Sequence, residues 1–145
     1  SIRNSFCNGI KTSMFKGSFL EVDFNKSFDI CVSNPPFYHS DVIKSENENK
    51  KIARYNDNLP LNDFILKTSK ILKNDGKFFF CYDAKQLSEI IKNLSNSKLN
   101  IEALQFVHPK KDIEASLVLV YARKNSKSLL KVLSPLIVFE NDNFT

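Results

Sequence analysis

The chain has 145 residues, a formal net charge of +5 and a sequence pI of about 9.1. Its length and its 42% hydrophobic content suit one globular domain. No apolar run is long enough to span a membrane, and the first residues lack the charged-then-apolar pattern of a signal peptide. The mild basic excess is compatible with nucleic-acid binding and equally with a lysine-rich, well-solvated surface.

The three cysteines, Cys7, Cys31 and Cys81, show no Cys-x-x-Cys spacing. Cys31 and Cys81 sit inside apolar patterns, which predicts buried free thiols in a reducing, cytoplasmic compartment. No metal-ligand spacing stands out elsewhere, so we expect a protein without a metal.

The beginning of the chain predicts a helix and then a short strand. Apolar residues recur at helical spacing at Ile2, Phe6, Ile10 and Met14, and Gly9 marks a plausible helix end. We therefore expect the chain to start within a helix, and residues 15–20 predict the strand that follows it.

Residues 28–33 are an apolar run typical of a fully buried parallel strand. Asn34, Pro35, Pro36 and Phe37 follow it directly. Two consecutive prolines fix φ and have no N–H, so the chain must leave the sheet stiffly. The pattern predicts a rigid rim at the carboxyl end of a strand, where ligands bind in open α/β sheets.

This rim suits chemistry on an amino group. The exocyclic amine of adenine is a poor nucleophile because its lone pair is delocalised into the ring. Two hydrogen-bond acceptors would draw the amine toward tetrahedral geometry, and the Asn34 side-chain oxygen and the Pro35 carbonyl are candidates. The ring of Phe37 can stack on the base.

Residues 38–58 are polar and have no clear apolar period, which predicts a mobile loop beside the rim. Tyr38 and His39 are candidate substrate contacts, and Lys44 and Arg54 could meet phosphates of a nucleic acid. A solvated insertion without a function is the alternative.

The remaining chain alternates helices and buried strands. Asn58 and Pro60 precede a helix that the Asn74-Asp75-Gly76 turn ends, and Asp83 with Gln86 fits the capping box of a second helix. The expected ranges are helices over 61–72 and from 84 to 94, strands over 77–82, 100–108 and 114–123, and a short edge strand over 136–139. The order predicts an α/β fold with a mainly parallel sheet and a terminal antiparallel hairpin.

The Asn34-Pro35-Pro36-Phe37 stretch resembles the motif of S-adenosylmethionine-dependent amino-group methyltransferases. Four further stretches resemble the bacterial tRNA adenine-N6 methyltransferases that act on a valine tRNA: Arg54 with Asn56, Asp57 and Leu59; residues 72–78; residues 106–109; and residues 117–120. The resemblance implies the carboxyl-terminal portion of a Rossmann-like methyltransferase fold. It also implies methyl transfer from S-adenosylmethionine to N6 of adenine in tRNA, with Asn34, Pro35, Pro36 and Phe37 as catalytic residues.

The chain departs from that family in the cofactor site. Gly9, Gly17 and Gly76 are its three glycines and form no Gly-x-Gly turn. Ser18 stands where the family often has an aspartate, so Ser18, its neighbour Phe19 and Asn34 are the implied cofactor contacts, although Phe19 also suits the core. We therefore expect residues 1–145 to be one incomplete methyltransferase domain, inactive alone, with an unpaired strand at the edge of its sheet.

Two other functions fit the same residues. A release-factor glutamine methyltransferase presents a side-chain amide to a similar motif, and a non-catalytic RNA-binding or partner domain needs no cofactor loop. The oligomeric state stays open.

Overall fold

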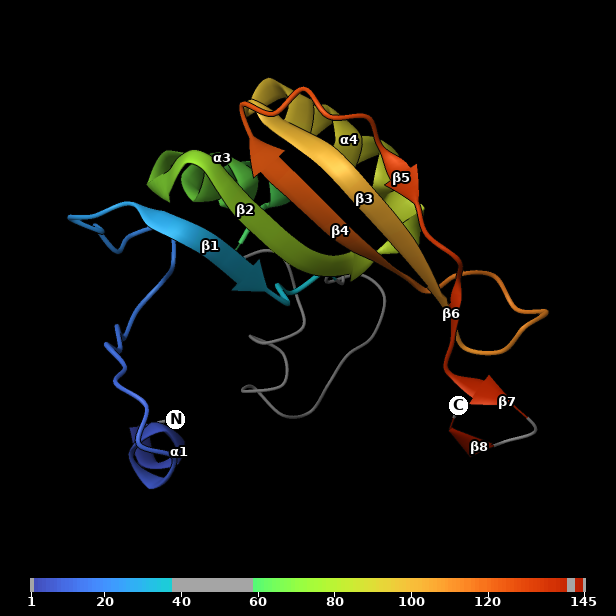
Figure 1. The fold of residues 1–145 in the computed structure, drawn as a ribbon, viewed down its shortest axis with the longest axis horizontal. Helices are drawn as coiled ribbons and strands as arrows, with labels where there is room; N and C mark the ends of the chain where they lie inside the picture. The colour runs from blue at the N-terminus through green and yellow to red at the C-terminus, as the bar shows by residue number, and fades with distance from the viewer. Residues whose placement is uncertain (1, 38–58, 141–142, 145) are drawn as a thin grey trace.

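The computed structural model describes residues 2–37, 59–140 and 143–144 and shows a six-stranded sheet with two helices against it (Figure 1). Its strand order is β1-β2-β4-β3-β5, and β6 also pairs with β3. The elements are α1 (Ile2–Cys7), β1 (Phe28–Ser33), α3 (Leu61–Ile71), β2 (Leu72–Asp83), the 3₁₀ turn η2 (Ala84–Gln86), α4 (Leu87–Asn96), β3 (Leu99–His108), β4 (Leu117–Lys124), β5 (Lys131–Val132), β6 (Leu136–Ile137), β7 (Phe139–Glu140) and β8 (Asn143–Phe144).

Strand direction confirms the predicted fold class. β1 pairs parallel with β2, and β3 pairs parallel with the short β5 and β6. β4 pairs antiparallel with both β2 and β3. All of these strands except β4 therefore run in one direction, and β3 with β4 forms the predicted terminal hairpin. The expected edge strand over 136–139 is present in part, as β6.

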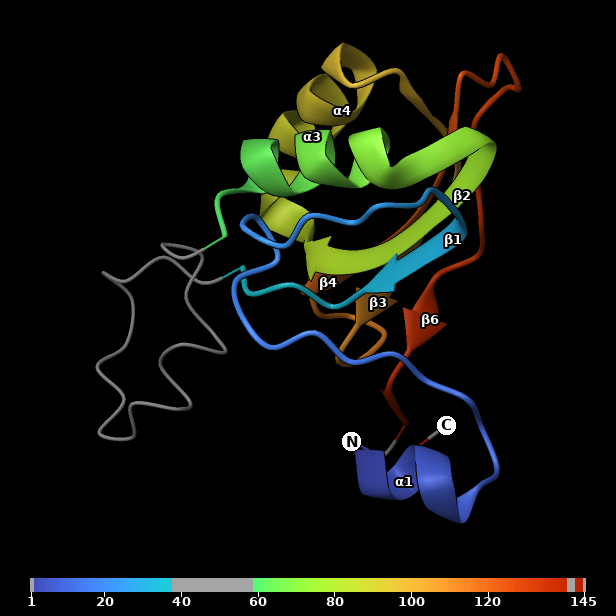
Figure 2. The ribbon, with the colours of Figure 1, turned by 90° about the vertical axis from the view of Figure 1, so that its left-hand side faces the viewer.

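The two helices α3 and α4 lie on the same side of the sheet (Figure 2). The apolar face of each helix packs against the strand residues that point to that side of the sheet. Such packing is expected, because apolar residues line one face of a helix every 3.6 residues and one face of a strand every second residue. Phe64 of α3, for example, lies with its ring centroid 5.6 Å from that of Phe78 in β2. The core comprises Leu61, Phe64, Ile65, Leu72, Phe78, Phe80, Tyr82, Ile90, Leu94, Leu99, Leu104, Val118, Val120 and Ala122.

The strand β1 is less buried than its apolar sequence predicts. It lies at one end of the sheet, with β2 as its neighbour. Ile30 and Val32 point away from the helices and are 55% and 75% exposed. The prediction of a fully buried strand is wrong. The apolar sequence of a strand does not reveal whether another helix or strand covers its second face. Among the residues that the structure describes, β1 pairs with β2 alone, as expected for an open strand edge.

The predicted strand over residues 15–20 is also wrong. These residues form an irregular segment with a turn in which the Ser18 carbonyl accepts hydrogen bonds from the N–H groups of Glu21 and Val22 (3.1 and 3.2 Å). The rings of Phe15 and Phe19 pack instead on Phe24, with centroid distances of 5.4 and 6.0 Å. The helix before this segment is confirmed as α1, which lies apart from the sheet (Figure 2).

The turn at residues 74–76 does not directly follow the helix. The helix α3 ends at Ile71, and β2 starts at once with an irregular register toward β1. Asp75 has φ of 59°, and a Cβ on Gly76 would lie 2.8 Å from the Lys73 carbonyl oxygen. The Asp75-Gly76 pair therefore shapes a bulge inside the strand. Pro60 is the N-cap of α3, and Asn58 lies outside the described residues.

Candidate functional site

The motif Asn34 to Phe37 leaves the sheet at the carboxyl end of β1. Ser33, the last residue of β1, lies beside Phe80 of the parallel strand β2. The carboxyl end of β2 therefore reaches the same edge of the sheet two to three residues later, at Tyr82. The ring of Phe37 contacts the ring of Tyr82, with a centroid distance of 5.7 Å. The structure thus places the motif where the predicted rim requires it.

The motif residues differ in how far they are buried. Pro35 is buried, whereas Asn34 immediately before it is exposed. Phe37 is half-buried and packs against the hydrophobic core. The chain is therefore fixed on both sides of Pro36, while Asn34 is accessible to solvent. A stacking role for the Phe37 ring stays a prediction, because part of that ring is used in the contact with Tyr82.

The structure also brings Gln86 to the motif, a contact that we did not predict from the sequence. The Gln86 side-chain Nε2 donates a hydrogen bond to the Phe37 carbonyl oxygen at 3.1 Å. The sequence predicts Gln86 as the second half of a capping box with Asp83. The Asp83 cap is present, since its carboxylate accepts a hydrogen bond from the Lys85 N–H at 2.9 Å. Gln86 instead contacts a residue 49 positions earlier in the chain.

The two implied cofactor contacts on the earlier segment have structural roles of their own. The Ser18 hydroxyl accepts a hydrogen bond from the Leu20 N–H at 3.3 Å. The ring of Phe19 lies 5.9 Å from the ring of Phe64 in α3, and it packs against the core. Phe19 therefore fits the core alternative that the sequence left open.

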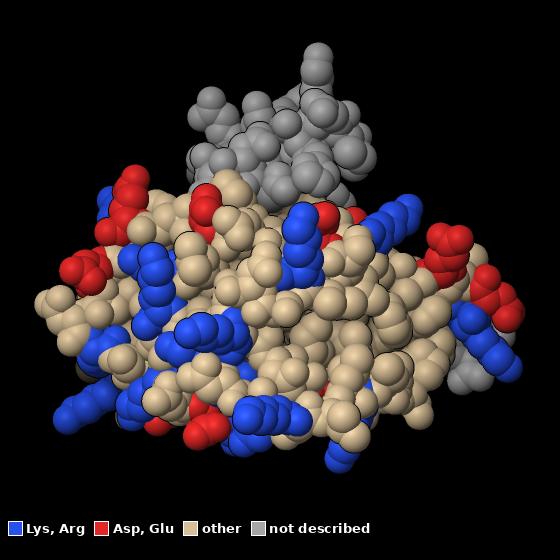
Figure 3. All heavy atoms as spheres, turned by 90° about the horizontal axis from the view of Figure 1, so that it is seen from above, with Lys and Arg blue, Asp and Glu red and all other residues tan. Residues whose placement is uncertain are grey.

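Four candidate substrate residues, Tyr38, His39, Lys44 and Arg54, lie outside the described residues, as does the whole loop 38–58. Figure 3 shows Lys and Arg side chains spread over the face seen from above, with Asp and Glu among them. On that face the basic side chains are therefore interspersed with acidic ones and not gathered in one cluster.

Two cavities flank the sheet. One, of about 470 Å³, lies on the sheet face without helices and is lined mostly by apolar side chains, including Val32, Phe79, Leu119 and Tyr121. Ser33 also lines it, so the cavity reaches the residue just before the motif. An apolar surface beside an exposed amide is a suitable wall for a flat heterocycle.

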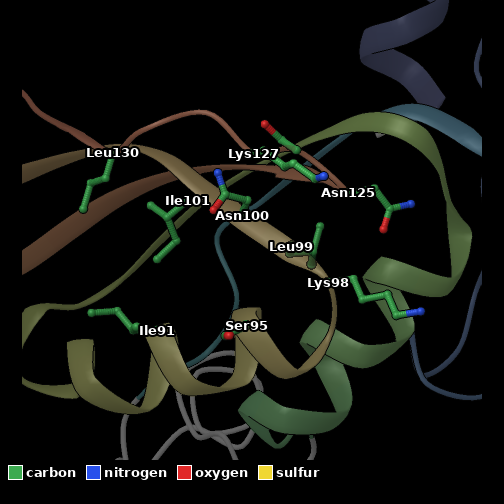
Figure 4. Close-up of a pocket in the computed structure, with 10 residues that line it drawn as sticks. Ile91, Ser95, Lys98, Leu99, Asn100, Ile101, Asn125, Lys127 and Leu130 are labelled. Carbon is green, nitrogen blue, oxygen red and sulfur yellow. The ribbon is translucent and has the colours of Figure 1, made fainter.

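The other cavity, of about 650 Å³, lies between α4 and the connection after β4 (Figure 4). Ile91 and Ser95 of α4 line one side, and Ile101 and Leu130 the other. Leu99, where β3 begins, also lines it. The strand β3 runs in the same direction as β1. The start of β3 therefore lies at the amino ends of the strands, whereas the motif lies at the carboxyl end of β1. This cavity is therefore separate from the candidate site.

Neither thiol near the site is suited to nucleophilic chemistry. Burial raises the pKa of the Cys31 thiol, against a smaller opposing effect of the Thr68 side chain. Burial also raises the pKa of Cys81. Both groups are therefore protonated at neutral pH, and a thiolate nucleophile is disfavoured.

The described residues contain neither a cluster of metal ligands nor a membrane-spanning helix. In the part of the chain that the structure describes, no three His, Cys, Asp or Glu side chains gather as metal ligands. Within the same residues no helix is long and apolar enough to cross a membrane.

The sequence is similar to a known family of methylases and to curated tRNA methyltransferases. The sequence profile of the Eco57I restriction-modification methylases matches residues 2–111. Two curated relatives are both named tRNA1(Val) (adenine(37)-N6)-methyltransferase. That of Pedobacter heparinus is 28% identical over 83 residues, covering 57% of this chain and 35% of the relative. That of Dyadobacter fermentans is 21% identical over 136 residues, covering 93% of this chain and 56% of the relative. The chain thus spans a third to just over half of their length.

Solved structures agree on the fold. An Agrobacterium tumefaciens protein with a predicted O-methyltransferase assignment superposes with a TM-score of 0.61 at 22% identity, covering 81% of this chain and 47% of that one. A Listeria monocytogenes protein assigned to the class I S-adenosylmethionine-dependent methyltransferases gives a TM-score of 0.51 at 18% identity, covering 81% and 39%. The predicted Rossmann-like methyltransferase fold is confirmed, and so is the predicted resemblance to tRNA adenine-N6 methyltransferases.

Proposed function

The chain belongs to the Eco57I restriction-modification methylase family, and from this membership we propose that the whole protein transfers a methyl group from S-adenosylmethionine to N6 of adenine in tRNA. The observation that carries the proposal is the exposed Asn34 beside the buried Pro35 at the carboxyl edge of the sheet. The names of the curated relatives support tRNA as the substrate.

The described residues fit the methyl-accepting side of this chemistry. S-adenosylmethionine supplies an electrophilic methyl group on a sulfonium centre. Asn34 is exposed at the rim and could contact both the cofactor and the amine. Ser18 is the weaker candidate for holding the cofactor, because its hydroxyl already accepts the hydrogen bond from Leu20.

The motif acts on the amine by hydrogen bonding and by position. The Asn34 side-chain oxygen and the Pro35 carbonyl accept the two N–H groups of the amine, which leaves its lone pair free to react. The new N–C bond forms as the S–C bond breaks, and the resulting ammonium loses a proton to water. No strong base is required, so the rate depends mainly on how well the acceptors hold the amine in line.

The test is methyl transfer from tritium-labelled S-adenosylmethionine. Asn34→Ala should lower turnover with tRNA by at least about 100-fold, as expected when a transition-state hydrogen-bond partner is lost. Its binding of S-adenosylmethionine, measured by calorimetry, should change much less. Asn62→Ala is the matched control, because Asn62 is also an exposed asparagine but lies on α3. Turnover by Asn34→Ala close to that of the control would overturn the proposal.

Parallel incubations identify the substrate. The family description names restriction-modification methylases, so duplex DNA is a specific second candidate beside tRNA. A release factor is a third, because a glutamine amide also presents two N–H groups to the motif. Label in DNA or in release factor, without label in tRNA, would replace the substrate and keep the reaction.

A binding measurement tests whether this chain is sufficient. S-adenosylmethionine should bind a protein extended at the amino end of the chain and should bind the chain of residues 1–145 weakly or not at all, because the chain has no Gly-x-Gly turn. Equal binding by both would mean that residues 1–145 are sufficient to build the cofactor site.

A further inference from the structure

The contact between Gln86 and the motif gives Gln86 a place in the proposed reaction. Its Nε2 lies 3.1 Å from the carbonyl oxygen of Phe37. Gln86 is half-buried, so this hydrogen bond is partly shielded from competing water. The contact connects the end of β2 to the motif at the end of β1.

The motif has an intrinsic need for an external donor. Pro35 and Pro36 have no N–H, so two successive residues of this stretch cannot donate hydrogen bonds. Their rigid rings fix φ at Pro35 and Pro36 but do not by themselves prevent a pivot of the backbone at Phe37, which other contacts must restrain. A donor on the Phe37 carbonyl limits that pivot from the far side of the prolines.

The fold holds Gln86 in place for this contact. The Asp83 carboxylate accepts the Lys85 N–H and so shapes the 3₁₀ turn Ala84–Gln86. The Ala84 N–H donates to the Ser116 carbonyl at 3.2 Å, which ties the same turn to the chain leading into β4. The backbone that carries Gln86 is therefore fixed at two points, one local and one across the sheet.

We propose that Gln86 is a positioning residue that holds the Asn34 and Pro35 acceptors in register with the amine. The proposal rests on the proposed function and adds to it a residue outside the Asn-Pro-Pro-aromatic stretch. Gln86 does not touch the reacting atoms. It acts through the Phe37 carbonyl, while the Phe37–Tyr82 ring contact and the burial of Pro35 supply the other restraints.

The experiment compares variants at Gln86 with a matched control at Asn100. Gln86→Leu removes the donor at similar size, Gln86→Glu replaces it with an acceptor, and Gln86→Lys restores a donor. Asn100 makes the same kind of bond, from its Nδ2 to the Ser128 carbonyl at 2.8 Å, near the start of β3 and so at the opposite end of the strands from the motif. Asn100→Leu therefore measures the general cost of losing such a bond.

Two readouts distinguish positioning from a purely structural role. With the whole protein, kcat should fall roughly 10- to 100-fold in Gln86→Leu and Gln86→Glu, while the KM for S-adenosylmethionine changes little. Gln86→Lys should recover part of the rate, and Asn100→Leu should keep it. With the chain itself, amide hydrogen exchange at Asn34 and Phe37 should be roughly two- to tenfold faster in Gln86→Leu, which corresponds to one lost hydrogen bond.

The outcomes separate this proposal from the proposed function. If no substrate is methylated by the wild-type protein, the proposed function fails, and the exchange measurement still decides whether Gln86 restrains the motif. If the wild type is active and Gln86→Leu keeps its kcat and exchange rates, Gln86 is not a positioning residue. If Asn100→Leu loses as much activity as Gln86→Leu, the effect is general and the proposal is likewise overturned.

Discussion

The two faces of the sheet are built from alternate residues of the same strands, and they differ in what covers them. On the helix side Phe78 and Phe80 of β2 are 0% and 3% exposed. On the other side Val32, Phe79 and Tyr121 form a row across β1, β2 and β4. Val32 is 75% exposed and Phe79 is 37% exposed. In Figure 1 the strands lie in front of α3 and α4, so this second face is turned toward the viewer.

The comparison shows that apolar residues alone do not define a core. Both faces carry side chains that gain free energy on burial. Only the side covered by α3 and α4 realises that gain in full, whereas within residues 2–37, 59–140 and 143–144 no helix lies over the other. We therefore expect the stability of this chain to depend on one face and to be much less sensitive to changes on the other.

The largest expected effect comes from two neighbouring phenylalanines. Phe78 is fully buried, with its ring centroid 4.5 Å from that of Phe80. Phe79 stacks on Tyr121 at 4.6 Å on the open face. Phe78→Ala should lower the free energy of unfolding by about 3–5 kcal/mol. Phe79→Ala should cost about 1 kcal/mol, mainly the lost ring contact. Urea unfolding of both variants measures the difference.

A milder pair guards against a variant that does not fold. Phe78→Leu and Phe79→Leu should show the same order with smaller losses, because a leucine leaves a smaller cavity. Equal losses at the two positions would contradict the comparison and would mean that the second face is covered in solution.

The next effect concerns how the helix layer is tied to the sheet. The Lys124 Nζ, at the end of β4, donates to the carbonyls of Ser69 and Leu72 at 2.6 and 2.8 Å. These carbonyls lie at the end of α3, where helical partners are missing. Lys124→Met keeps the side-chain stem and removes both bonds, so we expect a loss of about 1–2 kcal/mol in urea unfolding. Lys131→Met, at the exposed strand β5, is the control and should change little.

Local patterns predicted most of the elements correctly. The helical period over 61–72 and the apolar run over 28–33 coincide with α3 and β1, and the apolar run over 77–82 lies within β2, which begins earlier, at Leu72. The hairpin of β3 and β4 is also confirmed. The sequence signals for these elements are the spacing of apolar residues and the capping residues. Both are local, because the residues involved lie within a few positions of each other.

The failures share a dependence on distant residues. Residues 15–20 contain Phe15, Phe19 and Leu20, but a strand needs a partner that this stretch does not specify. The exposure of Val32 depends on whether an element lies over it. The contact of Gln86 spans 49 positions, whereas the capping pattern that predicted its role spans three. The roles of Tyr38, His39, Lys44 and Arg54 stay predictions.

The smallest expected effect is a pH dependence at the polar end of the open face. Glu102 accepts a hydrogen bond from the Arg123 Nε at 2.8 Å and another from the Ser126 hydroxyl. The pKa of Glu102 is lowered, and the hydrogen bond from Ser126 is the largest cause. Burial acts in the opposite direction and raises this pKa, whereas the hydrogen bond from Arg123 lowers it further. The neighbouring Tyr121 has a raised pKa, from burial and then from the Glu102 charge, so Tyr121 is neutral over the acidic range.

A lowered pKa in the folded state fixes the sign of the effect. The Glu102 carboxylate contributes stability that is fully present above its unfolded pKa of about 4.3, and this contribution is lost as the pH falls through the lower folded value. The Tm of the wild type should therefore exceed that of Glu102→Gln at pH 7, and the difference should shrink toward pH 3. Thermal unfolding at both pH values tests this. A constant difference would mean that the Glu102 cluster stabilises by packing and neutral hydrogen bonds alone, and that the open face carries no titrating contribution to stability.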